Sequence, residues 1–253
     1  MDERTAPAID QQRAVSYGTR AELYDRVRPY YPPQTLSPLL AALPAAPKRC
    51  RVVDVGAGTG KLTTALAQAG LDVDAVEPDP RMRTVLTARL PTIRVHAGRG
   101  EKLPLDQTSV DAVVYGNSWH WVDPAAASIE ALRVLRSNGI LAMLWNYEND
   151  DMPWLTALDQ LLGISSHQRP TPSMLQGFHP AEVTRIRWSR QQNVAALPDY
   201  VLSHSMVAVL PVLQQQQVLA AVRQLTAEHP DLLGHDHVTV PMQVVSWIYH
   251  RHN

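Results

Sequence analysis

Short apolar runs alternate with helical patterns between residues 51 and 146, and this alternation restricts the fold more than any other feature of the sequence. Parallel strands need a crossover connection, so the alternation is typical of repeated strand–helix–strand units. Five runs predict strands, at residues 51–55, 72–79, 92–98, 110–116 and 140–146. Three patterns predict the intervening helices, at residues 61–70, 79–91 and 123–136.

The helix limits are marked by local signals. Asp79–Pro80 and Asp123–Pro124 each combine an N-cap aspartate with a proline at the first helical position. Gly70 is a typical residue just after a helix, and the Ser-Asn-Gly sequence at 137–139 predicts the end of the third helix.

We therefore predict an α/β fold: a Rossmann-like, doubly wound, mostly parallel sheet of about seven strands with helices on both faces. The β-like runs at 182–190 and 237–250 are expected to complete the sheet, one of them as an antiparallel strand. Residues 10–45 predict two helices around the sequence Arg-Pro-Tyr-Tyr-Pro-Pro.

Composition excludes several classes of partner. The net charge is −1 and 19% of the residues are charged, which provides no basic face for a nucleic acid. The single Cys50 excludes an internal disulfide and fits a reducing compartment. Neither a secretory leader nor an apolar run of about 20 residues is visible, so we expect a cytoplasmic protein without a membrane partner. The histidine pairs lack metal-site spacing, so no metal is expected.

Three glycines, Gly56, Gly58 and Gly60, follow the first predicted strand. A phosphate-binding P-loop has four residues between its glycines and a Ser or Thr after the lysine, whereas here there are three residues and Leu62 follows Lys61. A dinucleotide-binding loop has its third glycine one residue later. A turn without any ligand is the remaining alternative, although three glycines are a costly choice for a bare turn.

Two acidic residues accompany the glycine loop. Asp54 ends the first predicted strand, and Glu77 follows 17 residues after Gly60. The two oxygens of a carboxylate at Glu77 match the two vicinal hydroxyls of a ribose. An acidic residue beside the loop repels a pyrophosphate but suits an ammonium group, a combination that describes S-adenosylmethionine.

Consecutive sequence motifs resemble those of class I S-adenosylmethionine-dependent methyltransferases: VVDVGAGTGKLT, AVEPDPRM, GRGEKLPL, VDAVVYGNSWHWVD and ALRVLRSNGILAMLWN. The resemblance is closer to the small-molecule branch that includes trans-aconitate methyltransferase, and it covers residues 15–150 best. It implies a cap at 1–45 over the cofactor site, a cofactor-binding core at 46–150 and a C-terminal part at 151–253. This last part completes the sheet and adds substrate-shaping helices, all within one compact domain.

The resemblance also implies roles for individual residues. The methionine end of S-adenosylmethionine is expected to meet Asp54, Gly56, Ala57, Gly58 and Thr59. The ribose and adenine are expected to meet Glu77, Pro78, Asp79, Met82, Gly100 and Glu101. Arg99 stands where relatives often have the acidic residue that meets the adenine amino group, so the adenine contact departs from the family pattern.

Two further segments match family motifs. Asn117 and His120 lie in the loop that should face the transferred methyl group, with Asn117 beside the cofactor and His120 as a candidate general base. A positioning role and a plain structural role remain alternatives for His120. Arg28, in a segment that covers the cofactor in relatives, is expected to meet the cofactor or a substrate carboxylate, with a surface arginine as the alternative.

The resulting hypothesis is methyl transfer from S-adenosylmethionine to a small molecule, leaving S-adenosylhomocysteine. O-methylation of a carboxylate or hydroxyl is favoured, and C-methylation is possible. The alternatives are a non-catalytic nucleoside-binding or interaction protein on the same fold and an NAD-dependent oxidoreductase, which the glycine spacing disfavours.

Overall fold

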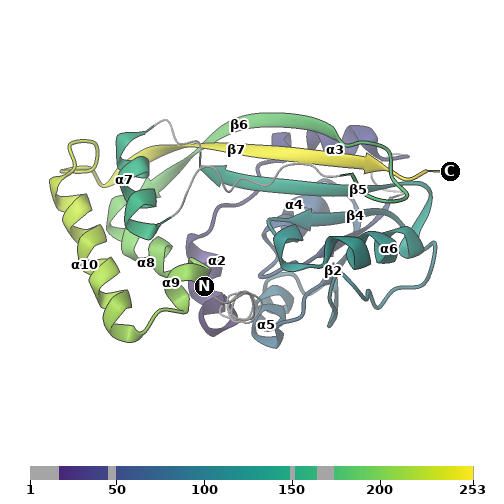
Figure 1. The fold of residues 1–253 in the computed structure, drawn as a ribbon, viewed down its shortest axis with the longest axis horizontal. Helices are drawn as coiled ribbons and strands as arrows, with labels where there is room; N and C mark the ends of the chain where they lie inside the picture. Colours follow the sequence, from purple (N-terminus) through teal and green to yellow (C-terminus); the bar gives the residue numbers. More distant parts are fainter. Residues whose placement is uncertain (1–16, 45–49, 149–151, 164–173, 253) are drawn as a thin grey trace. The chain divides into compact units, whose positions relative to one another are not determined.

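The computed structural model describes residues 17–44, 50–148, 152–163 and 174–252 (Figure 1). The start of the helical segment predicted at 10–45 lies outside the described residues. Contacts divide the chain into two units, described separately below. The sheet unit comprises Pro29–Asn146, Thr171–Ile186 and Gln243–Asn253. The helical unit comprises Met1–Arg28, Tyr147–Pro170 and Arg187–Met242.

One seven-stranded sheet has the strand order β3-β2-β1-β4-β5-β7-β6. Its strands are β1 (Arg51–Val55), β2 (Asp72–Val76), β3 (Arg94–His96), β4 (Val110–Gly116), β5 (Leu135–Glu148), β6 (Glu182–Asn193) and β7 (His237–His250). The pairs β1–β2, β2–β3, β1–β4 and β4–β5 are parallel. Figure 1 shows β7 running opposite to its neighbour β5, which confirms the predicted mixed sheet.

The helices of the sheet unit lie before β1 or between successive strands in the sequence. They are α3 (Ser37–Ala42), α4 (Lys61–Gln68), α5 (Pro80–Arg89) and α6 (Pro124–Val134), with 3-10 turns at Pro33–Leu36 and Trp119–Trp121. The chain steps outward from β1 to β2 and β3, but in the opposite direction from β4 to β5. Because crossovers of this kind are right-handed, α4 and α5 cover one face of the sheet and α6 covers the other.

The predicted helix starts are confirmed, and one predicted helix end is wrong. The Asp79 carboxylate accepts from the Arg81 N–H at 2.8 Å, and the Asp123 carboxylate accepts from the Ala126 N–H at 2.8 Å. The helix predicted to run to residue 136 ends at Val134 instead. Leu135 already belongs to β5, where it is the strand partner of Val110 of β4 and its side chain is fully buried.

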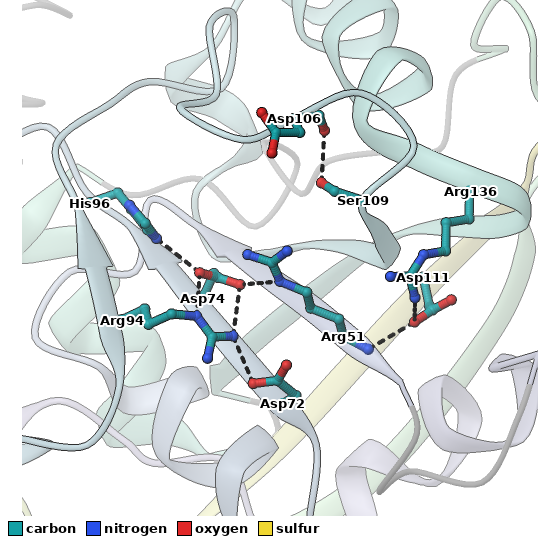
Figure 2. Close-up of polar contacts among 9 residues, drawn as sticks. All are labelled: Arg51, Asp72, Asp74, Arg94, His96, Asp106, Ser109, Asp111 and Arg136. Atoms are coloured by element: carbon teal, nitrogen blue, oxygen red, sulfur yellow. Dashed lines mark hydrogen bonds and ion pairs between the residues drawn. The ribbon is translucent and has the colours of Figure 1, made fainter.

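A polar network joins the neighbouring strands β3, β2, β1 and β4 (Figure 2). The buried Asp74 of β2 accepts from Arg51 at 2.7 Å and from Arg94 at 2.9 Å, and it lies 2.8 Å from His96 Nε2. Burial opposes ionisation of Asp74, but these partners outweigh it and lower its pKa below the usual value. Asp111 of β4 accepts from the backbone N–H of Arg51, so polar contacts tie these strands together at the end of the sheet opposite the glycine loop.

The helical unit consists of short helices around one long helix. They are α2 (Ala21–Val27), α7 (Pro153–Leu162), α8 (Leu197–Leu202), α9 (Ser205–Ala208) and α10 (Val212–Glu228), with 3-10 turns at Tyr17–Arg20 and Val194–Ala196. Helix α10 contacts α7, α8 and α9, and α2 contacts α8. Among the described residues, no helix is long and apolar enough to span a membrane.

Candidate cofactor site

The candidate site lies at the carboxyl ends of β1 and β4, the two strands between which the direction of winding reverses. Loops leave the sheet in opposite directions at such a point, which opens a place for a ligand. The glycine loop follows β1, and the loop that contains His120 follows β4. The two loops meet at Ser118, whose hydroxyl donates to the Val55 carbonyl at 2.6 Å.

The glycines of the first loop adopt backbone conformations that other residues avoid. Gly56, Gly58 and Gly60 have φ angles of 70°, 57° and 86°. A Cβ atom at Gly56 would lie 2.6 Å from the Cβ of Ser118, so the second loop requires a glycine there. A Cβ at Gly58 would meet no described atom within 4 Å, which leaves the Gly58 backbone open to a ligand.

Glu77 connects the glycine loop to the end of β2. Its side chain is buried, and its two oxygens accept from the backbone N–H groups of Gly58 and Asp79, each at 2.8 Å. Burial raises the pKa of the Glu77 carboxyl above its usual value, against the effect of these hydrogen bonds. Each oxygen retains a second lone pair, so the ribose hydroxyls predicted as its ligands are compatible with this geometry.

Asp54 lies at the end of β1 with its side chain buried. The Thr63 hydroxyl, on the first turn of α4, donates to its Oδ2 at 2.6 Å. Burial raises the pKa of Asp54 to about 7, and the negative charge of Glu77 adds to the shift, whereas Thr63 opposes it. A cationic ligand would favour the ionised form of such a carboxyl group.

These residues fit the methionine and ribose portions of S-adenosylmethionine. Two buried carboxyl groups suit an ammonium group and a pair of hydroxyls, and they disfavour a pyrophosphate. The hydroxyl of Thr59, in the glycine loop, is buried and has no hydrogen-bond partner among the described residues. An additional polar ligand atom would satisfy it, because buried hydroxyls nearly always have a partner.

The neighbouring predicted residues lie at the start of α5. Met82 is buried and Pro78 is exposed. The Asp79 carboxylate is engaged within the chain, since it caps the helix and pairs with Arg81 at 3.0 Å. Although Asp79 is largely buried, its pKa lies below the usual value because the bonds from Arg81 outweigh burial. Glu77 therefore contacts the glycine loop, whereas Asp79 caps α5.

Gly100 and Glu101 form a turn that packs against the loop after β4. A Cβ at Gly100 would lie 2.8 Å from Val122 Cγ1 and 2.9 Å from the Tyr115 hydroxyl. One oxygen of Glu101 accepts from the Asp123 N–H at 2.9 Å. The turn is thus placed beside the second loop, and the predicted contact of Gly100 and Glu101 with adenine stays a prediction.

Asn117 holds the ends of β4 and β5 together. Its Oδ1 accepts from the Asn146 N–H at 2.7 Å and from the Tyr31 hydroxyl at 3.1 Å, and its Nδ2 donates to the Asn146 carbonyl at 2.8 Å. The Asn146 side chain donates in turn to the Tyr30 carbonyl at 2.9 Å. Sequence reasoning missed Asn146, although its position directly after an apolar strand was an available signal.

His120 lies in the 3-10 turn Trp119–Trp121 and is exposed. Its ring centroid is 4.3 Å from that of Trp121 and 5.2 Å from that of Trp145 on β5. Trp119, by contrast, is buried and packs edge to face on Tyr115. The loop therefore presents an imidazole next to two indole rings, which suits a flat acceptor as well as a packing role.

Arg28 belongs to the helical unit and not to the sheet unit. It donates to the Ser203 carbonyl at 3.1 Å, and its guanidinium lies 5.2 Å from the centre of the Tyr200 ring. Its predicted contact with the cofactor stays a prediction. Among the described residues, no group of three or more His, Cys, Asp or Glu side chains is arranged to hold a metal.

Comparison with known proteins assigns the chain to a family. A methyltransferase domain family matches residues 53–143. An uncharacterized methyltransferase of Mycobacterium tuberculosis (strain ATCC 25618 / H37Rv) is 40% identical over 233 residues, which cover 92% of this chain and 94% of that protein. A demethylmenaquinone methyltransferase of Beutenbergia cavernae is 33% identical over 165 residues, 62% of this chain and 67% of that protein.

A solved structure shares the fold. It is a protein of Anaeromyxobacter dehalogenans provisionally described as a type II methyltransferase, with a TM-score of 0.63 and 20% identity over 88% of this chain and 97% of that chain. The seven-stranded sheet agrees with the fold that the sequence motifs predicted. The chain belongs to the methyltransferases and is a class I S-adenosylmethionine-dependent methyltransferase.

Proposed function

We propose that the chain methylates a small-molecule acceptor, on a carboxylate or hydroxyl oxygen, with the donor seated on the glycine loop. This donor site is supported by two buried carboxyl groups, those of Asp54 and Glu77, next to Gly58. A Cβ atom at Gly58 would meet no described atom within 4 Å, so a ligand can approach the backbone there. In this proposal Asp54 meets the ammonium group and Glu77 the ribose hydroxyls. The loop glycines Gly56 and Gly58, with Ala57 and Thr59, line the methionine portion.

S-adenosylmethionine supplies an activated methyl group when bound, so the protein contributes mainly alignment and proton handling. His120 is the side chain proposed to take the proton of a hydroxyl acceptor, since an imidazole titrates near neutral pH. Trp121 and Trp145 flank it and would hold a flat acceptor against the same loop. A carboxylate acceptor would need no base at all.

The proposed mechanism assigns Asn117 a positioning role. Its side chain joins the ends of β4 and β5, and the loop that carries His120 starts directly after it. Asn117 itself has a φ of 50°, a conformation that asparagine tolerates better than most residues. Fixing this backbone would keep His120 in place relative to the strands.

A transfer screen tests the proposal. The purified chain is incubated with methyl-labelled S-adenosylmethionine and a panel of small carboxylic acids, phenols and quinone precursors. The last group is included because of the similarity to the demethylmenaquinone methyltransferase. We expect label on an oxygen of at least one acid or phenol. Label on carbon alone would overturn the O-methylation assignment, and tight cofactor binding without any transfer would contradict small-molecule methylation.

A further inference from the structure

Trp145 lies close to the end of β5, in the sheet unit that also holds the candidate cofactor site. The next residue, Asn146, is bound to the side chain of Asn117 at the end of β4 through its backbone N–H and carbonyl. The loop that carries His120 starts directly after Asn117. Trp145 therefore lies on a strand that is fastened to the start of this loop.

The ring of Trp145 has two planar neighbours. Its centroid is 5.2 Å from that of His120 and 6.2 Å from that of Trp247 on β7, with interplanar angles of 34° and 55°. All three residues belong to the sheet unit. Trp145 and Trp247 are buried, whereas His120 is exposed. Trp145 thus connects the core of the sheet unit to the imidazole that is the proposed base.

The indole nitrogen of Trp145 lacks a hydrogen-bond partner among the described residues. The residue is only 7% exposed, and its Nε1 atom is buried. An indole N–H can only donate, and a buried donor without an acceptor is costly. Trp154, in the helical unit, also has an unpaired nitrogen, so this property alone does not define a site. The position of Trp145 beside His120 is what points to a ligand of the reaction.

A hydroxyl acceptor would make two different contacts at this place. His120 is proposed to take the proton of the reacting hydroxyl, and the protonated imidazole then remains a donor to that oxygen. A second donor on the same oxygen would engage a lone pair and make the oxygen a weaker nucleophile. The N–H of Trp145 therefore suits a different oxygen of the same molecule. One small ring with two oxygen substituents can bridge side chains whose centroids are 5.2 Å apart.

We propose that the N–H of Trp145 donates a hydrogen bond to an oxygen of the acceptor other than the one that is methylated. The acceptor is then a planar ring with two oxygen functions, a diphenol or a hydroxyaryl carbonyl compound. This inference rests on the proposed function, because it narrows the small-molecule acceptor to one chemical class. Stacking on the indole rings favours a planar molecule, and the N–H disfavours any planar molecule that would leave it unpaired.

Calorimetric titration of the full chain, saturated with S-adenosylhomocysteine and kept free of oxygen, compares phenol with catechol, resorcinol and hydroquinone. These diphenols differ from phenol only in the second hydroxyl, and from each other in its position. We expect at least one diphenol to bind at least about fivefold more tightly than phenol, as a hydrogen bond to an otherwise unpaired donor implies. A smaller advantage for all three, or no saturation by any of them up to about 20 mM, would overturn the proposal.

Matched variants locate the contact. Trp145→Phe removes the N–H but keeps an aromatic ring, so the advantage of the diphenol should shrink to within about twofold. Loss of stacking area weakens phenol and diphenol alike and cancels in their ratio. Trp247→Phe truncates the neighbouring buried indole in the same way and should keep the advantage.

An advantage that survives Trp145→Phe, or that is lost equally in both variants, would contradict the site. Benzothienylalanine at position 145 has the shape of tryptophan with sulfur in place of the N–H. It serves if the phenylalanine variant does not fold, and the same loss of the advantage is expected.

Methyl transfer distinguishes an acceptor from a separate ligand. Trp145→Phe should lower kcat/KM for the preferred diphenol at least about fivefold more than for phenol, and it should leave the affinity for S-adenosylhomocysteine unchanged. An unchanged ratio of the two kcat/KM values, despite weaker binding of the diphenol, would overturn the assignment to the acceptor. Failure of the proposed function would instead appear as absence of methyl transfer by the unmodified chain to every acid and phenol of the transfer screen.

Discussion

The backbone N–H of Gly58 donates a 2.8 Å hydrogen bond to the carboxylate of Glu77, which joins the glycine loop after β1 to the end of β2. The other oxygen of the same carboxylate accepts from the Asp79 N–H. One buried side chain therefore sets the geometry of two segments that the account places around the donor. Replacing the Glu77 carboxylate should therefore lower both the stability of the fold and the affinity for the ligand.

Glu77→Gln should lower the free energy of unfolding by about 1–3 kcal/mol, because the amide NH₂ would face one of the two backbone donors. The affinity for S-adenosylhomocysteine should fall with it, measured by calorimetric titration. Glu130→Gln is the control, since Glu130 lies in α6 and accepts a hydrogen bond from the Leu103 N–H. It should lower stability but keep the affinity, and similar affinity losses in both variants would contradict a specific role for Glu77.

Gly56→Ala and Gly58→Ala should separate packing from ligand access. Both place an alanine at positive φ, which costs about 1–2 kcal/mol. Only Gly56→Ala adds a clash with Ser118. The free energy of unfolding, measured by chemical denaturation, should therefore fall by about 1–3 kcal/mol more in Gly56→Ala than in Gly58→Ala. Gly58→Ala should stay folded and bind S-adenosylhomocysteine poorly. Normal affinity in that variant would mean that no ligand approaches the Gly58 backbone.

The raised pKa of Asp54 predicts a pH dependence of stability and binding. Its pKa is about 7 in the folded chain against a usual 3.8, so the folded state binds more protons between these values. This contribution to stability is complete below the lower pKa and is lost as the pH rises through the higher one. The ligand-free chain should therefore lose stability between about pH 4 and 7, and Asp54→Asn should reduce that loss.

Binding should follow the opposite trend, because an ammonium ligand favours ionised Asp54. The affinity for S-adenosylhomocysteine should rise with pH through about 7, the pKa of Asp54. Thr63→Val removes the hydroxyl that donates to Asp54 and should shift this rise to higher pH. Thr64→Val, which loses only a bond to the Gly60 carbonyl, should leave the midpoint unchanged. A pH-independent affinity would disprove the role given to Asp54.

His120→Gln should separate a catalytic base from a packing residue. With a phenol acceptor, kcat should fall by roughly 10²–10⁴, and the pH profile should lose its ionisation near neutrality. With a carboxylate acceptor the rate should change little. Equal losses with both acceptors would indicate that His120 acts by positioning the loop between Trp121 and Trp145.

The fold could be predicted from the sequence because its signals are local. Asp79–Pro80 and Asp123–Pro124 mark helix starts through bonds to residues two or three positions away. The start of β5 was missed for the opposite reason. Its first residue, Leu135, is extended because it pairs with Val110 and fills the core, which a helical pattern running to residue 136 does not reveal.

The candidate site was only partly predictable from the sequence, because some of its contacts join residues that are far apart in the chain. Glycine spacing and the strand-end acids led to Asp54 and Glu77, since such positions converge in any parallel sheet. The partners that fix these acids, the Thr63 hydroxyl and the Gly58 N–H, depend on how the loop closes on the sheet. The bonds between Asn117 and Asn146 join residues 29 positions apart, and no spacing rule predicts them.

The central claim is that Asp54 and the glycine loop hold the methyl donor. Its most direct test is titration of the unmodified chain and of Asp54→Ala with S-adenosylhomocysteine and, separately, with NAD. The account predicts saturable binding of S-adenosylhomocysteine and none of NAD by the unmodified chain, with loss of binding in the folded variant. Binding of NAD, or an affinity of Asp54→Ala for S-adenosylhomocysteine within about twofold of the unmodified chain, would contradict it.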